Sequence, residues 1–380
     1  MGYKLNEEGK ELVNLAKVFS EKELKPVVAE CDRKCILPME VYEKAFEIGL
    51  HLMEIPKEYG GLGLDYQTIF AVWEEIAKTD AGFATSLAAN SLALKPVLLA
   101  GNDEQKKYFA KYITREKGNG FAAFALTEAD AGSDAAAGKT TAIRDGNEYV
   151  INGSKCFITN GGLAQIYVVF ALTDKSKGVK GISAFIVERN REGVSVGKEE
   201  DKMGIRLSNT TEVIFDNVRI PADHLIGTEG KGFIYAMQTL DLARPTIGAV
   251  SVGIMQRAID EAVSYAKIRY TFGKPIIKHQ AIAFKLADME IKKETARASV
   301  INALNIYSSD GDFTKAAAIC KAYASDCAVQ VALEAIQILG GYGYSREYPV
   351  EKLLRDAKIM QIFEGTNEIQ HVVIAGAISR

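Results

Sequence analysis

A carboxylate near the end of the chain, Glu364, has the sequence surroundings that a proton-abstracting base requires. It follows an apolar and aromatic stretch that ends at Phe363, and Gly365 comes directly after it. A carboxylate in such dry surroundings is expected to have a raised pKa, which suits it to removing a proton near neutral pH. The same residue could instead be a carboxylate that stabilises a helix N-terminus, and the sequence alone leaves both interpretations open.

Two further clusters contain residue types that bind charged ligands. Arg269 begins the segment 269–275, which lies between two long segments of helical character and is followed by His279-Gln280. A guanidinium held there can bind pyrophosphate through two parallel hydrogen bonds, and the alternative is an arginine that complements a helix dipole. The segment 126–134 offers hydroxyls and backbone N–H groups to a ligand, and its alternative is an ordinary acidic surface loop.

Several common catalytic and nucleotide-binding motifs are absent. The chain has no Gly-x-Gly-x-x-Gly, Gly-x-Ser-x-Gly or His-Glu-x-x-His motif, so nothing announces a nicotinamide-binding unit, a serine hydrolase or a zinc protease. Gly132 and Gly138-Lys139-Thr140 approach a P-loop, but five residues separate the glycines where the motif has four. Neither the four histidines nor the five cysteines have a local metal-binding spacing.

The composition is that of a large, near-neutral globular protein. Of 380 residues, 48% are hydrophobic and 25% are charged, and the formal net charge is −3. Without a basic excess there is no electrostatic argument for nucleic-acid binding. The longest clean apolar run, 166–172, is far shorter than the ~20 residues of a membrane-spanning helix. The N-terminus shows no apolar secretory segment, so we expect no membrane span and a cytoplasmic protein with reduced thiols.

Hydrophobic periodicity divides the chain into three parts. Residues 1–120 show helical spacing, residues 121–230 contain short runs rich in β-branched and aromatic residues, and residues 231–380 return to helical spacing. We therefore expect an α+β multidomain fold with an N-terminal helical domain, a middle antiparallel β-sandwich or barrel domain and a C-terminal four-helix bundle. No low-complexity linker separates the parts, which predicts that they pack as one rigid body.

Some individual elements follow from the same patterns. Asn152-Gly153 predicts a hairpin turn between two strands of the middle part. Pro245 predicts the start of a long helix in the third part. The chain is expected to begin with one amphipathic helix over residues 7–30.

Taken together, the three clusters resemble those of the acyl-CoA dehydrogenase family in kind and in order, and the likeness extends over residues 4–380. Further segments that fit the family pattern are Phe157–Gly162, Asp201–Gly204, Gln337–Gly343 and Arg355–Lys358. The chain is most similar to the short- and medium-chain members, of the butyryl-CoA dehydrogenase type.

The resemblance implies an FAD-dependent α,β-desaturation of a short- or medium-chain or aromatic acyl-CoA thioester. Glu364 would remove the α-proton while a hydride leaves the β-carbon for flavin N5, and electron-transferring flavoprotein would accept the electrons. The backbone N–H of Glu364 and a flavin hydroxyl would polarise the thioester carbonyl. A homotetramer is also implied, because the FAD site of the family borrows residues from a neighbouring subunit.

Three other functions remain open within the resemblance. The same chemistry can run in reverse, in an enoyl-CoA or arylacrylyl-CoA reductase complexed with electron-transferring flavoprotein. An acyl-CoA oxidase would pass the electrons to oxygen instead. A non-catalytic flavin electron relay is the alternative that needs no base at all.

The family motifs assign roles to particular positions of this chain. Expected cofactor-binding residues are Phe124, Leu126, Thr127, Gly132, Ser133, Phe157, Ile158, Thr159, Arg269, Phe272, Gln280, Gln337, Gly340, Gly341, Thr366 and Glu368. Expected substrate-binding residues are Ser133, Asp241, Arg244, Phe363 and Gly365. No metal ligand is implied.

Some positions depart from what relatives carry. Phe157 stands where Trp is common in the family, so an aromatic face is kept and the indole N–H is lost. Leu242 and Ala243 leave no carboxylate at the place where long-chain and isovaleryl members have their base, which favours Glu364 as the base here. Medium-chain members carry Glu near the pocket floor where this chain has Ala88, so we expect a roomier acyl pocket that takes a branched or aromatic group.

Overall fold

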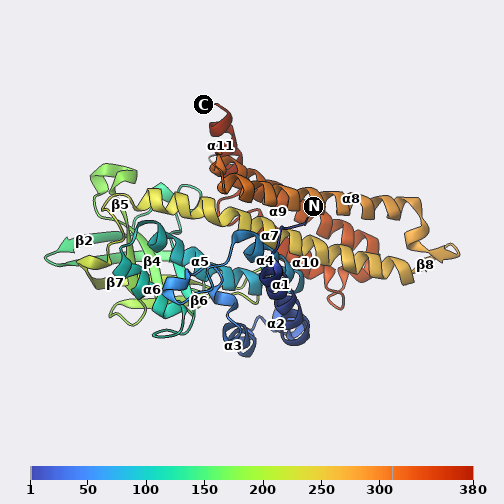
Figure 1. Cartoon of the computed structure of the whole chain (residues 1–380), viewed down its shortest axis with the longest axis horizontal. Coiled ribbons are helices and arrows are strands. Elements are labelled where there is room, and N and C mark those ends of the chain that lie inside the picture. The colour runs from blue at the N-terminus through green and yellow to red at the C-terminus, as the bar shows by residue number, and fades with distance from the viewer. Residues whose placement is uncertain (1, 310, 380) are drawn as a thin grey trace.

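The computed structural model describes residues 2–309 and 311–379 and arranges them along one long axis (Figure 1). A β-sheet lies at one end, long helices extend from it to the other end, and the N-terminal helices pack against the middle. The fold class expected from the sequence, a helical part, a β part and a helical bundle, is confirmed.

The first part of the chain is helical, as predicted. Its helices are α1 Glu7–Phe19, α2 Lys25–Lys34, α3 Met39–Glu47, α4 Tyr66–Thr79, α5 Ala81–Ala100 and α6 Asp103–Ile113. The single helix expected over residues 7–30 is interrupted by a π-helical turn, Ser20–Leu24, between α1 and α2. Pro26 lies just after this turn and lacks the N–H that would bond to residue 22, which accounts for the widened turn before it.

Helix α5 was not indicated by hydrophobic periodicity, because apolar residues occur on all its sides and most of its residues are buried. Its N-terminus is capped by Asp80, whose carboxylate accepts a 2.7 Å hydrogen bond from the N–H of Phe83. Within the described part of the chain it is the one helix long and apolar enough to cross a membrane. The protein itself buries most of it, as it buries any core helix.

The middle part is a seven-stranded sheet in the order β1-β4-β2-β3-β7-β6, with β5 also paired to β4. The strands are β1 Ala122–Ala125, β2 Thr141–Asp145, β3 Glu148–Thr159, β4 Ile166–Leu172, β5 Ile182–Glu188, β6 Val194–Glu199 and β7 Thr210–Pro221. Most pairs are antiparallel, whereas β1 and β2 each pair with β4 in parallel, which the sequence did not indicate.

The hairpin predicted at Asn152-Gly153 is wrong. β3 runs through both residues, and the turn lies instead between β2 and β3, where Gly146 has a φ of +61°. Gly153 sits at a register shift in the pairing of β3 with β7. A Cβ on Gly153 would lie 2.5 Å from the hydroxyl of Thr140, so glycine is needed there for a close approach between strands rather than for a turn.

The third part consists of α7 Gly232–Ile268, α8 Gln280–Tyr307, α9 Phe313–Leu339, α10 Val350–Met360 and α11 Asn367–Ile378, with a short hairpin of β8 Tyr270–Thr271 and β9 Lys274–Pro275. Pro245 does not start a helix as predicted but lies inside α7. Its surroundings are buried, so packing of α7 against its neighbours compensates for the lost backbone hydrogen bond. At Gly253 a Cβ would lie 2.4 Å from the carbonyl oxygen of Glu74, which shows how closely α7 and α4 pack.

Buried charges join the three parts. Lys352 of α10 donates a 2.6 Å hydrogen bond to Asp80, which precedes α5. Asp356, one turn later in α10, accepts a 2.6 Å hydrogen bond from the N–H of Ile205 in the loop between β6 and β7. The helical ends of the chain and the sheet are therefore held together by polar contacts as well as by a shared core.

Candidate functional site

Glu364 lies in a tight turn between α10 and α11. Its backbone is left-handed, with a φ of +58°, and that of Gly365 has a φ of +86°. A left-handed conformation costs a residue with a side chain about 1–2 kcal/mol, and such residues concentrate at functional sites. Thr366 caps α11 by accepting from the N–H of Ile369. The acidic residue of the first turn is Glu368, so Glu364 is not the helix-stabilising carboxylate of the alternative interpretation.

The carboxylate of Glu364 is buried among cations without being paired to one. Its Oε2 atom has no solvent-accessible surface and no hydrogen-bond partner among the described residues. Burial raises the pKa of Glu364 to about 7, and the nearby charges of Arg244, Lys95 and Lys321 act in the opposite direction. The backbone N–H of Glu364 also has no acceptor within the described part of the chain. The turn thus presents an acceptor for a proton beside a donor for a carbonyl oxygen.

Asp241 and Arg244, both predicted to meet the substrate, lie on α7 and contact each other. The Nη1 atom of Arg244 donates to Asp241, and the hydroxyl of Thr314 donates to the same carboxylate over 2.6 Å. The Nε–H of Arg244 is buried and has no partner among the described residues. Arg244 is therefore a fixed cation near Glu364 that still has a donor to offer.

A buried ion pair organises the loop that follows β1. Lys155 of β3 donates to Glu128 over 2.7 Å and to the carbonyl of Leu126 over 3.0 Å. Glu128 also accepts hydrogen bonds from the backbone N–H groups of Lys139 and Thr140, at 2.6 and 3.0 Å. The segment 126–134 is thus not a plain acidic surface loop, because its first acidic residue is a buried structural anchor.

The predicted cofactor residues of this loop and of β3 come together. The carbonyl of Thr127 accepts a 2.9 Å hydrogen bond from the N–H of Cys156, next to Phe157. Phe157 has a φ of +55° at a bulge in the pairing of β3 with β7. The residue is 66% exposed to solvent. Phe124 packs its ring 4.9 Å from that of Phe170, while Ile158 is buried and Gly132 and Ser133 are exposed. An exposed aromatic residue and an exposed loop hydroxyl, that of Ser133, are therefore available where this loop meets β3.

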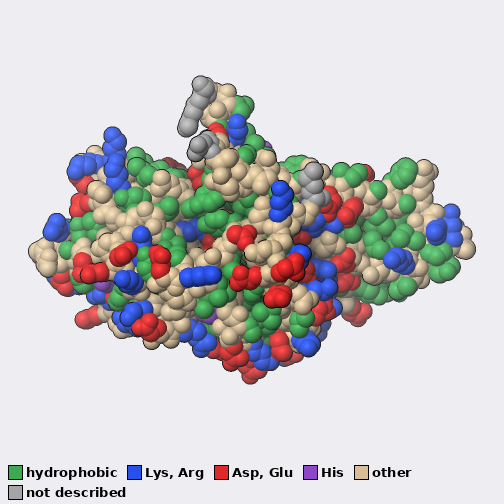
Figure 2. Space-filling view, viewed as in Figure 1, with side chains coloured by type: hydrophobic (Ala, Val, Ile, Leu, Met, Phe, Trp, Pro, Cys, Tyr) green, Lys and Arg blue, Asp and Glu red, His purple; other side chains and the backbone are tan. Residues whose placement is uncertain are grey.

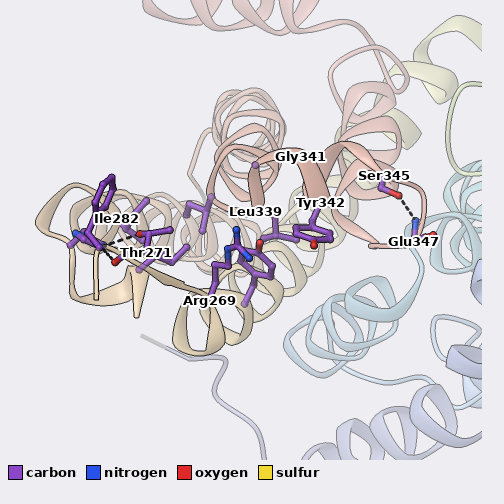
Figure 3. Close-up of a pocket in the computed structure, with 14 residues that line it drawn as sticks. Arg269, Thr271, Ile282, Leu339, Gly341, Tyr342, Ser345 and Glu347 are labelled. Atoms are coloured by element: carbon purple, nitrogen blue, oxygen red, sulfur yellow. Dashed lines mark hydrogen bonds between the residues drawn. The ribbon is translucent and has the colours of Figure 1, made fainter. Parts of the chain in front are cut away.

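The remaining predicted cofactor residues lie around a pocket of about 770 Å³ at the far end of the bundle (Figure 3). Arg269, Phe272, Gly340 and Gly341 line it, whereas Gln280 and Gln337 are exposed and do not. The guanidinium of Arg269 lies 6.0 Å from the ring centre of Tyr342, and Phe272 is 97% exposed. The pocket offers a cation and aromatic faces, a combination that suits a phosphate joined to a flat ring.

One chain does not bring the two halves of the predicted cofactor site together. The hairpin that follows Arg269 lies at one end of the molecule and the sheet that carries Phe157 lies at the other (Figure 1). Helix α11, which begins just after Glu364, leaves the bundle in the region between them (Figure 1).

Sequence reasoning missed two cations whose charges act on Glu364. Lys95 is buried and forms an ion pair with Glu54, and Lys321 is buried on α9. A signal for Lys95 existed, since it is the single charged residue of the twenty in the apolar segment 81–100. The described residues contain no group of histidine, cysteine, aspartate and glutamate fit to hold a metal ion, and all five cysteines are unpaired.

Comparison with known families and structures adds to this geometry. Three family models match successive parts of the chain: the N-terminal domain of acyl-CoA dehydrogenase over residues 6–117, its middle domain over 123–218 and its C-terminal domain over 230–379. The chain is 47% identical to a short-chain-specific acyl-CoA dehydrogenase of Megasphaera elsdenii, over the whole of both chains. It is also 47% identical to an acryloyl-CoA reductase (NADH) of Anaerotignum propionicum, over 100% of this chain and 96% of the relative.

Two solved structures are similar over their whole length. The butyryl-CoA dehydrogenase of Megasphaera elsdenii superposes with a TM-score of 0.96 and is 45% identical, with 100% of both chains covered. A chain in a structure of the electron transferring flavoprotein of Acidaminococcus fermentans, from work on flavin-based electron bifurcation, has a TM-score of 0.95 and 44% identity, again with 100% of both chains covered.

Proposed function

The chain belongs to the acyl-CoA dehydrogenase family, and we propose that it is an FAD-dependent enzyme that desaturates a short- or medium-chain or aromatic acyl-CoA thioester between its α and β carbons. The observation that carries this proposal is the turn at Glu364. A carboxylate with a pKa of about 7, whose buried Oε2 has no hydrogen-bond partner among the described residues, lies in a left-handed backbone. Its own backbone N–H likewise has no acceptor among those residues.

The residues of the site fit FAD. The exposed ring of Phe157 and the loop containing Thr127 and Ser133 suit the isoalloxazine and ribityl groups. The pocket at Arg269 and Phe272 suits the pyrophosphate and adenosine. Because these two places lie at opposite ends of one chain, we propose that a second copy supplies the Arg269 pocket to each flavin, within a homotetramer. Figure 2 shows hydrophobic side chains over the end of the bundle that carries α8, where Phe284 and Ile291 are exposed.

The chain's own residues account for the proton chemistry. A pKa of about 7 leaves a substantial fraction of Glu364 ionised at neutral pH, and it makes this carboxylate a stronger base than an ordinary glutamate. Its backbone N–H would donate to the thioester oxygen, where negative charge develops as the α-proton leaves. Arg244 stabilises the ionised carboxylate, and its Nε–H, which no other described residue accepts, can donate to the ligand. When bound, FAD supplies the acceptor for the hydride that leaves the β-carbon.

The partner and the direction follow from the relatives rather than from the site. We propose electron-transferring flavoprotein as the electron acceptor, on the strength of the similarity to the Acidaminococcus structure. The reverse reaction, as an enoyl-CoA reductase, is the second candidate, because a reductase relative is as similar to this chain as a dehydrogenase relative is. We propose a cytoplasmic location.

Anaerobic titration of the yellow protein with a panel of acyl-CoA thioesters tests the proposal. The flavin absorbance should bleach with at least one saturated thioester, and Glu364→Gln should slow the bleaching by about 10²–10⁴-fold, the usual contribution of a general base. Bleaching at the wild-type rate in Glu364→Gln, or none in either protein, would show that the proposed function is wrong. Peroxide formation under air would identify an oxidase instead.

A further inference from the structure

Lys321 makes an unusual set of contacts beneath the turn at Glu364. It lies on α9 and is fully buried. Its ammonium donates a 2.8 Å hydrogen bond to the carbonyl of Gly365 and a 3.0 Å bond to the side-chain oxygen of Asn367. The side-chain N–H of Gln370 donates to the same Gly365 carbonyl over 2.8 Å. Two donors from different helices therefore meet on one carbonyl, directly after the candidate base.

The partner Asn367 is itself held in a fixed orientation. Its side-chain N–H group donates to Asp326 over 2.7 Å and to the hydroxyl of Ser325 over 2.9 Å. These bonds leave the side-chain oxygen of Asn367 turned toward Lys321, since an amide that donates on one side accepts on the other. Lys321 thus donates to two acceptors of fixed orientation near the start of α11, the carbonyl of Gly365 and the side-chain oxygen of Asn367.

The charge of Lys321 has no carboxylate partner of its own among the described residues. Arg244 is paired with Asp241 and Lys95 with Glu54, so the other two cations near Glu364 are largely compensated. Burying an unpaired ammonium is costly, and burial lowers the pKa of Lys321 to about 8. Among the charges that act on Lys321, Glu364 is the foremost carboxylate, ahead of Asp326 and Glu368, while Arg244 opposes it.

We propose that Lys321 is a positioning residue that locks the left-handed turn at Glu364 and Gly365, so that the carboxylate and the backbone N–H of Glu364 are both presented to the substrate. The inference rests on the proposed function of Glu364 as the base. Because Lys321 and Gln370 both donate to the carbonyl of Gly365, the peptide plane after Gly365 is fixed. The fixed plane holds Glu364 and Gly365 in the left-handed backbone conformation, which a turn without these bonds would not keep. The same ammonium favours the ionised form of the base.

Three variants separate these roles. Lys321→Met removes both the charge and the hydrogen bonds, Lys321→Gln removes the charge and keeps a donor, and Gln370→Leu removes the other donor without changing the charge. The control is Lys293→Met, another buried lysine, which lies on α8 and donates to Gln256 of α7 and to Glu290 of its own helix rather than to the turn. Each is purified with FAD, and the rate of flavin reduction by the best acyl-CoA is followed anaerobically by stopped flow from pH 6 to pH 9.5.

We expect Lys321→Met to reduce flavin at least about tenfold more slowly at pH 7, since a tenfold change corresponds to ~1.4 kcal/mol and a hydrogen bond to a charged group is worth that or more. Its kinetic pKa should rise above that of the wild type, so that part of the rate returns at high pH. Lys321→Gln should show the same rise in kinetic pKa as Lys321→Met, but its limiting rate should be higher than that of Lys321→Met because a hydrogen-bond donor remains. Gln370→Leu should lower the limiting rate without moving the kinetic pKa, and Lys293→Met should match the wild type.

The inference is overturned if Lys321→Met or Lys321→Gln melts at a lower temperature but keeps the wild-type pH profile and limiting rate, because Lys321 would then only tie α9 to α11. If Lys321→Met does not fold, the profile of Lys321→Gln decides alone. Failure of the proposed function looks different: Glu364→Gln would then reduce flavin as fast as the wild type. An inactive Glu364→Gln combined with unchanged Lys321 variants contradicts the role of Lys321 alone.

Discussion

Replacing Lys155 by methionine should damage the loop 126–134, which we propose binds the flavin, through one buried charge. Lys155 and Glu128 are both almost fully buried and lie 2.7 Å apart, so the variant leaves a carboxylate in the interior without its cation. Breaking a buried pair in this way costs about 3–5 kcal/mol. Two backbone N–H groups remain bonded to Glu128, so we expect the lower end of the range, about 3 kcal/mol, in the free energy of unfolding.

The chain offers a matched control for this variant in the same loop. Lys139 pairs with Asp130 over 2.7 Å, but their side chains are 75% and 74% exposed. Lys139→Met should therefore leave the stability close to that of the wild type. Urea unfolding followed by far-UV circular dichroism gives both values, and release of FAD on dilution reports the state of the loop. The double variant Lys155→Met with Glu128→Gln should recover much of the loss, because the uncompensated charge is gone.

The pH dependence of the same variant has a definite sign. The pKa of Glu128 lies below its ordinary value because Lys155 and the backbone N–H groups favour the carboxylate over the opposing effect of burial. The ion pair therefore stabilises the protein above the ordinary glutamate pKa of ~4.3, and this stability is lost as the pH falls through the folded pKa. The deficit of Lys155→Met should shrink in acid. A loss under about 1 kcal/mol at pH 7, or one equal to that of Lys139→Met, would refute the reasoning.

Three further predictions concern the rest of the site. Glu364→Gln should raise the melting temperature more at pH 8 than at pH 5. A carboxyl whose folded pKa is about 7 loses its stabilising contribution as the pH rises from the ordinary glutamate pKa of ~4.3 through 7. Equal shifts at both pH values would contradict this. Arg269→Met should weaken FAD binding by about 10–100-fold, the loss expected for hydrogen bonds from a charged group, while the neighbouring exposed Lys274→Met should bind FAD normally in a flavin-fluorescence assay. Wild-type enzyme should accept branched or aromatic acyl groups and Ala88→Leu should shift kcat/KM toward shorter chains; a strict wild-type preference for butyryl-CoA would rule out the roomier pocket.

Much of the fold could be predicted because its signals are local. The change from helical to alternating spacing near residue 121 and the return near residue 231 follow from which side of each element is buried. The errors occurred where tertiary contacts override local preference. Asn152-Gly153 is a strong turn dipeptide, yet the long pairing of β3 with β7 absorbs it as a bulge. Pro245 favours a first helical turn, yet α7 continues past Pro245 because its buried residues pack against the neighbouring elements.

The candidate site divides in the same way. Glu364 could be found because its apolar surroundings are adjacent in sequence. Lys321 and Lys95 could not be linked to it, because α9 and α5 meet the turn only in the folded chain. The separation of Arg269 from Phe157 is likewise a property of the three-dimensional arrangement, since sequence order carries no information on which end of the molecule each occupies (Figure 1).

Exchange of the α-hydrogens of an acyl-CoA with D₂O, followed by mass spectrometry under anaerobic conditions, tests most directly whether Glu364 is the base. The wild-type holoenzyme should introduce deuterium at the α-carbon, with a rate that rises as the pH passes through about 7. Glu364→Gln should retain its flavin and bind the same thioester without exchange. Exchange by Glu364→Gln at the wild-type rate would contradict the account, because the proton would then be removed by another group.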